Sequence, residues 1–259
     1  MTVDNKVVWA DLLNEAIELP GRLSEAYGLF HNYSLGNQFL AAAQLFERGM
    51  KLSPIGSFSK WKELGRNVKK GEKAISLVMP VTIKKKSESD SNSDDDDKFM
   101  VFTLKKNWFS LDQTIGEDYV QEIKITGWDK DVALTKLGIE EADFNILNGN
   151  AQGYALPSEM KVAINPLAVL PHKTVFHELA HCLLHSKEAM LADSATLTKS
   201  IVEVEAEATA YLCCATLQLS GLEESRGYIR DWLAGNELPD SSARRIFAAA
   251  DKILKAGSK

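Results

Sequence analysis

Residues 171–185 read PHKTVFHELAHCLLH, and this stretch decides how the C-terminal half of the chain folds. Its apolar residues recur at helical spacing, so it predicts a buried helix. His177 and His181 are four residues apart, which places both imidazoles on one face of that helix within reach of a single ion. Glu178 completes the HExxH pattern, which is typical of zinc sites. Because unpaired imidazoles in a core are costly, the stretch predicts a metal site.

The third ligand must come from outside this helix. A zinc site that performs chemistry needs three protein ligands and one open position, and His185 lies too far along the helix to join His177 and His181. On the next predicted helix, residues 195–219, Glu203 and Glu207 share a face. We predict that Glu203 is the third ligand and that Glu207 orients a ligating histidine; the reverse assignment is the alternative.

The composition is that of a soluble globular chain. It has 259 residues, 45% of them hydrophobic, and a net charge of -6, which excludes a uniformly basic nucleic-acid binder. It contains no long apolar run and no signal-peptide pattern at the first residues. The three cysteines show no CxxC spacing and are expected to be buried, reduced thiols. We therefore predict a cytoplasmic protein with no membrane partner.

The N-terminal half is expected to mix helices with a small antiparallel sheet, which makes the chain α+β overall. Residues 74–86 and 99–109 are rich in β-branched and aromatic residues and predict a hairpin. The segment between them, residues 87–98, has six acidic and no apolar residues and is expected to be a mobile insert. Further helices are predicted at 7–19, 35–50, 224–234 and 240–256, a short helix within 56–71, and strands at 144–147 and 161–164. We predict domains at 1–125 and 126–259.

Residues 48–110 form a basic region with interleaved aromatic residues. This region holds 14 Lys and Arg but only two acidic residues outside the insert. Cations that follow a phosphate backbone, together with aromatic faces that stack on bases, are typical of single-stranded nucleic-acid binding. The alternative is a set of core aromatics beneath an ordinary charged surface. The candidate DNA contacts are Lys60, Trp61, Arg66, Lys69, Lys70, Lys73, Lys105, Lys106 and Trp108.

The C-terminal half resembles the gluzincin metallopeptidases. It is similar to their compact ImmA/IrrE-type members, in which HExxHxxxH precedes an E-x-E-A helix; here these motifs lie at 177–185 and 203–206. The resemblance implies a mainly helical minimal zincin domain with bound Zn²⁺. It also implies that Glu178 acts as the general base that takes a proton from water.

The N-terminal half resembles the single-stranded DNA-binding domain of the ArdC antirestriction family. The resemblance is carried by HNYS at 31–34, GN at 36–37, FSKWKELG at 58–65 and VKKGEK at 68–73. In that family this domain precedes a zinc metallopeptidase-like domain, as here. The resemblance implies an antirestriction protein that binds single-stranded DNA. The alternatives are a regulatory metallopeptidase that cleaves a specific repressor or partner, and a DNA-binding protein whose zinc is structural.

Overall fold

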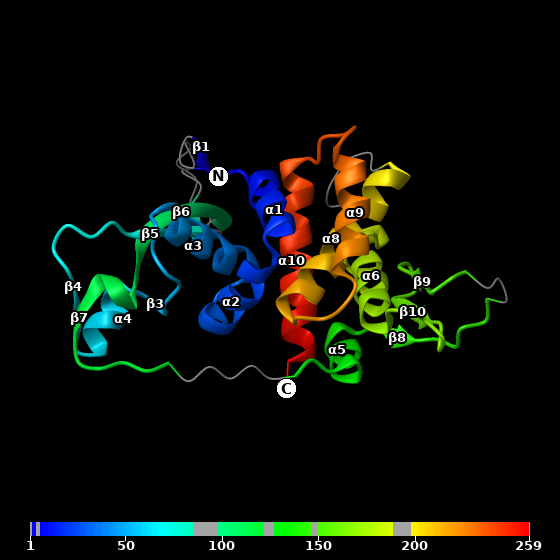
Figure 1. The fold of residues 1–259 in the computed structure, drawn as a ribbon. Helices are drawn as coiled ribbons and strands as arrows, with labels where there is room; N and C mark the ends of the chain where they lie inside the picture. Colours follow the sequence, from blue (N-terminus) through cyan, green and yellow to red (C-terminus); the bar gives the residue numbers. More distant parts are fainter. Residues whose placement is uncertain are drawn as a thin grey trace, which may run out of the picture. The chain divides into compact units, whose positions relative to one another are not determined.

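The computed structural model describes residues 2–3, 6–84, 98–121, 127–146, 150–188 and 198–258. The fold is α+β, as predicted, with small sheets in the N-terminal region and mainly helices in the C-terminal region (Figure 1). The acidic insert at 87–98 lies outside the described residues except for Lys98. Among the described residues, no helix has the length and apolar character needed to span a bilayer.

The chain forms two compact units, and neither is continuous in sequence. The first consists of residues 1–8 and 40–121, and the second of residues 9–39 and 122–259. The chain passes from the first unit to the second after residue 121, which is close to the boundary predicted after residue 125. Residues 9–39, however, belong to the second unit, although they were assigned to the N-terminal domain from the sequence.

The first unit is built around the predicted hairpin, which is confirmed. Strands β5 and β6 pair antiparallel, with Val78 opposite Leu104, and β3 pairs with the other edge of β6. The short helix expected within 56–71 is confirmed only as α4, because Arg66–Val68 forms a strand paired with β7. The elements are β1 (Thr2–Val3), β2 (Lys6–Val7), β3 (Ile55–Ser57), α4 (Phe58–Glu63), β4 (Arg66–Val68), β5 (Ile75–Lys84), β6 (Lys98–Ser110), the 3₁₀ turn η1 (Leu111–Gln113) and β7 (Thr114–Gly116). Helix α3 (Leu35–Glu47) crosses from the second unit into the first.

The second unit is a helical assembly centred on α8, with a small sheet. Every residue of α8 from Val204 onward is buried, because α6, α9, α10 and α2 all pack against it. The helices are α1 (Trp9–Glu18), α2 (Pro20–Phe30), α5 (Lys130–Leu137), α6 (Pro171–Leu184), α8 (Lys199–Thr216), α9 (Leu222–Leu233) and α10 (Asp240–Gly257) (Figure 1). The Tyr211 hydroxyl donates to the Ile17 carbonyl over 2.7 Å, which fixes α8 to the end of α1.

The small sheet of the second unit differs in part from the prediction. Its strands β8 (Glu140–Glu141), β10 (Lys161–Ile164) and β9 (Gly153–Leu156) lie in that order, so β9 is an edge strand. The strand predicted at 161–164 is confirmed. The strand predicted at 144–147 is wrong for residues 144–146, which are irregular, and residue 147 lies outside the described part. The antiparallel partner of β10 is instead β9, which also packs against α6.

Candidate metal centre

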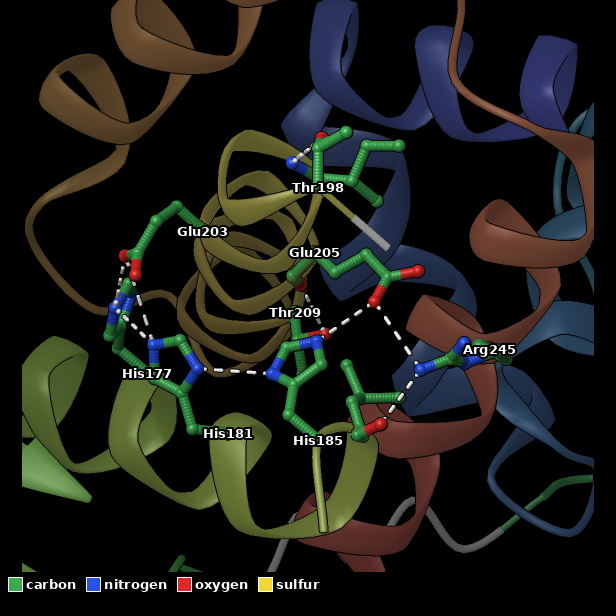
Figure 2. Close-up of polar contacts among 10 residues, drawn as sticks. His177, His181, His185, Thr198, Glu203, Glu205, Thr209 and Arg245 are labelled. Atoms are coloured by element: carbon green, nitrogen blue, oxygen red, sulfur yellow. Dashed lines mark hydrogen bonds and ion pairs between the residues drawn. The ribbon is translucent and has the colours of Figure 1, made fainter. Parts of the chain in front are cut away.

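Helices α6 and α8 bring two histidines and one glutamate together. The Nε2 atoms of His177 and His181 are 3.1 Å apart, and Oε2 of Glu203 lies 3.7 Å from the first and 3.8 Å from the second (Figure 2). Ligand atoms around a tetrahedral ion at zinc–ligand distances of about 2.0–2.1 Å are separated by about 3.3 Å. These three atoms therefore fit one divalent ion and leave a fourth position open. Among the described residues they form the only such cluster.

The local sequence explains why the two helices can present these groups to one point. The four-residue spacing stacks His177 and His181 on one face of α6. Small side chains at Ala180 and Ala206 belong to one buried cluster and let the α6 and α8 backbones approach closely. The side-chain hydroxyl of Thr198 accepts a hydrogen bond from the Ile201 amide and caps the start of α8, one turn before Glu203.

Glu207 lies where the sequence predicted an orienting carboxylate. Its Oε2 is 3.0 Å from Nδ1 of His177, on the side of the ring away from the cluster. Its other oxygen, Oε1, pairs with Nζ of Lys173 at 2.7 Å. A carboxylate that accepts the Nδ1 proton leaves the Nε2 lone pair of His177 free for a metal. The contact of Lys173 with Glu207 was not predicted from the sequence. It could have been considered because Lys173 lies four residues before His177 and therefore on the same face of the helix.

Neighbouring charges give the two cluster histidines opposite protonation states in the metal-free protein. Burial lowers the pKa of His177, but interactions with the Glu203 and Glu207 carboxylates outweigh burial and raise it to about 9. Burial and the charges of His177 and His185 lower the pKa of His181 to about 4. The interaction with His177 in turn lowers the pKa of Glu203. At neutral pH the cluster thus holds a proton on His177, in the place that an ion would take.

Metal binding should release this proton. A metal binds only the neutral imidazole, so affinity should rise by about tenfold per pH unit for each proton displaced, up to about pH 9, where His177 loses its proton unaided. Zinc titration with a pH indicator in weak buffer measures the release directly. A His172→Ala control, which alters an exposed histidine of α6, should release the same amount. A pH-independent affinity with no released proton would contradict the protonation state described here.

Glu178 lies beside the cluster in a confined environment. Burial is the main cause that raises its pKa to about 7, with a contribution from the negative charge of Glu203, while the charge of His177 opposes the rise. The backbone of the edge strand β9 lies directly beside the Glu178 side chain. A Cβ atom added to Gly153 of this strand would lie 3.0 Å from Oε1 of Glu178 and 2.8 Å from Cγ2 of Thr174. Only glycine therefore lets the β9 backbone approach this carboxyl so closely.

The three cysteines are buried and unpaired, as predicted. Burial raises the pKa of Cys182 and of Cys214 to about 12, and that of Cys213 well above its usual range. Such thiols stay protonated at neutral pH and behave as small apolar side chains. No cysteine belongs to the metal cluster formed by the described residues.

The first unit does not present the two predicted tryptophans to solvent. Trp61 is 2% exposed and donates its Nε1 hydrogen to the Phe109 carbonyl, and Trp108 is 7% exposed. Neither ring can stack on a base, because a stacking ring needs an open face. The compositional argument failed here because it could not separate core aromatics from surface aromatics. The exposed aromatic rings of the described part of this unit include Phe58 and Phe102, at 53% and 63% exposure.

The predicted cations of this unit differ in their surroundings. The Arg66 guanidinium donates to the side chain of Thr114 and to backbone carbonyls of residues 114, 116 and 117, which fastens β4 to β7. Lys69 donates to the Asp112 carbonyl over 2.8 Å, and Lys60 pairs with Glu63 at 3.5 Å. The remaining predicted cations, Lys70, Lys73, Lys105 and Lys106, are exposed. Lys105 and Lys106 are adjacent on β6 and point to opposite faces of the hairpin.

Comparison with known proteins finds similarity to one family and to solved structures, two of which are described here. Residues 18–108 match the family of the N-terminal domain of anti-restriction factor ArdC. The metal-free crystal structure of the antirestriction ArdC protein from the R388 plasmid is similar with a TM-score of 0.57 at 21% identity, covering 97% of this chain and 96% of that chain. Its Mn(II)-bound structure gives a TM-score of 0.57 at 19% identity, covering 97% and 98%. A search of curated proteins found no match.

Proposed function

We propose that this chain, whose residues 18–108 belong to the ArdC N-terminal domain family and whose fold is that of ArdC, is an antirestriction protein with two biochemical capacities. One is binding of single-stranded DNA, and the other is zinc-dependent hydrolysis of a peptide bond. The observation that carries the second is the convergence of His177, His181 and Glu203 on one point with Glu178 beside them. The donor set also fits other divalent ions, and R388 ArdC has been crystallised with Mn(II). Two imidazoles and one carboxylate with an open position are typical of catalytic zinc.

The residues around the cluster suit peptide hydrolysis. Zinc bound there would supply a Lewis acid that polarises a carbonyl and acidifies water. Glu178, with its pKa raised to about 7, can take the proton of the attacking water and return it to the leaving amine. Glu207 keeps His177 in the tautomer that presents Nε2 to the cluster. Hydrolysis by an activated water molecule needs no covalent nucleophile, so the buried cysteines have no part in this chemistry.

For DNA we propose the face of the hairpin that carries Phe102 and Lys106. Phe102, Leu104 and Lys106 lie two residues apart along β6, so their side chains share one face. Met100, on the same face, is 63% exposed, and Pro80 lies opposite Phe102. This face offers an open aromatic ring followed by a cation, which is the combination that stacking and phosphate contacts require. It replaces the buried tryptophans as the proposed base-stacking surface.

The test of this surface uses the full-length chain, because residues 9–39 pack with the second unit. Phe102→Ala should weaken binding of a single-stranded oligonucleotide by about 1–3 kcal/mol through lost stacking. Lys106→Gln should reduce the salt dependence by about one displaced counterion. The matched control is Ile115→Ala, which removes an exposed apolar side chain from β7. Unchanged binding in Phe102→Ala, or a salt-independent affinity of the wild type, would refute the proposed surface.

A further inference from the structure

His181 is oriented differently from His177. Where His177 contacts a carboxylate directly, Nδ1 of His181 lies 3.0 Å from Nδ1 of His185, the last histidine of the α6 sequence (Figure 2). Nε2 of His185 lies 2.9 Å from Oε2 of Glu205. His185 is 8% exposed and Glu205 is fully buried, so this set is shielded from water. From the sequence, His185 was placed outside the ligand set, as a residue that packs beside the ligands or supports them, and no role was assigned to Glu205.

The hydrogen bonds of this set can be assigned for a protein that binds a metal through His181. Nε2 of His181, the atom that faces His177 and Glu203, must then carry the lone pair, so the hydrogen of this neutral ring lies on Nδ1. Nδ1 of His185 accepts this hydrogen, and Nε2 of His185 donates its own hydrogen to Oε2 of Glu205, because a carboxylate accepts. Two hydrogen bonds thus hold His181 in the tautomer that offers Nε2 to a metal.

Arg245 of α10 supports the buried carboxylate. Its Nη2 lies 3.4 Å from Oε2 of Glu205 and donates to the Leu184 carbonyl over 2.8 Å, at the end of α6. A buried carboxylate without an opposite charge would be costly, so this contact compensates part of the cost of burying Glu205. The other oxygen, Oε1, has no hydrogen-bond partner among the described residues. Glu205 is therefore directed toward His185 and Arg245.

The geometry assigns His185, Glu205 and Arg245 as a positioning relay that fixes the tautomer of His181 and thereby prepares the metal site. This inference rests on the proposed metal-dependent function and extends it to three residues that lie outside the ligand set. The relay parallels the direct contact of Glu207 with His177, so each ligating histidine has its own support. Hydrogen-bonded supports of metal ligands typically contribute about 10–100-fold to metal affinity.

Two substitutions at His185 separate hydrogen bonding from packing. His185→Leu fills the space without hydrogen bonds, and zinc affinity should fall by about 10–100-fold. His185→Gln can accept from His181 with its carbonyl oxygen and donate to Glu205 with its amide, so its affinity should stay within about threefold of the wild type. His172→Leu, on the exposed first turn of α6, is the control. Thermal unfolding of each metal-free variant verifies that it is folded.

A second readout does not depend on metal. Long-range ¹H–¹⁵N correlation spectra are recorded on metal-free proteins that all carry His177→Ala, because the hydrogen on Nε2 of His177 would otherwise hold the tautomer of His181. They should show hydrogen on Nδ1 of His181 with His185 and with His185→Gln, and a tautomer mixture with His185→Leu. Wild-type affinity in His185→Leu, equal loss in both variants, or an Nε2–H tautomer of His181 in the protein that retains His185 would each overturn the relay. If the wild type binds no zinc, the proposed metal function fails, and the tautomer spectra still decide the relay.

Discussion

Replacing His177 and His181 together with alanine should abolish stoichiometric zinc binding. The pair supplies two of the three convergent ligand atoms, and Glu203 alone, at the rim of the site, cannot hold the ion. The wild type should gain thermal stability on addition of zinc, because a ligand that binds only the folded state stabilises that state. The gain is about 2.7 kcal/mol when the free zinc concentration is 100 times Kd. The double variant should gain none. Elemental analysis and thermal unfolding measure both effects.

The control for this result is His172→Ala, which removes a histidine of the same helix that lies outside the cluster. It should keep the metal content and the zinc-dependent stabilisation of the wild type. Equal zinc content in the double variant and the wild type would show that the ion binds elsewhere, and the assignment of the cluster would then be wrong.

Glu178→Gln should separate metal binding from hydrolysis. Glutamine keeps the shape of the side chain but cannot accept a proton, so hydrolysis should slow by about 10²–10⁴-fold, the usual contribution of a general base. Zinc content should be unchanged, because Glu178 is not one of the three convergent ligands. Comparison of the new protein N-termini in cells that produce the wild type or the variant identifies the cleaved substrate. The control is Glu237→Gln, which replaces an exposed glutamate.

The same variant distinguishes the proposed functions. Transfer of unmodified DNA into restricting cells can be measured with the wild type, with Glu178→Gln and without the protein. Loss of protection in the variant would make hydrolysis part of the antirestriction role. Full protection would show that this role depends on DNA binding alone. Identical N-termini in wild-type and variant cells, with zinc bound in both proteins, would contradict the hydrolytic assignment.

The sequence was sufficient to predict the arrangement of site residues that lie on one helix. The spacing of His177 and His181 fixes their relation on α6 whatever packs around them. Glu203 and Glu207 could be considered together because they share a face of the next helix, and close packing of Ala180 with Ala206 brings that face to the histidines. For this reason the sequence could predict that His177, His181 and Glu203 lie close together and that Glu207 lies beside His177.

The sequence was insufficient where a role depends on contacts between distant segments. Glu205 has a role only because α10 brings Arg245, forty residues later, to its side. Trp9 belongs to the second unit because its amide is capped by Asp240 and its ring packs on Phe247. Trp61 and its neighbours could not be divided into core and surface from composition, since both kinds of aromatic residue occur in the same strands and helix.

X-ray absorption spectroscopy of the zinc-loaded protein identifies the atoms that hold the ion. We expect only nitrogen and oxygen as nearest neighbours, at about 2.0–2.1 Å, with more distant scattering from two imidazoles. We expect no sulfur, because the three cysteines are buried outside the cluster. A sulfur shell at about 2.3 Å, or a spectrum unchanged in the His177→Ala, His181→Ala double variant, would contradict this expectation.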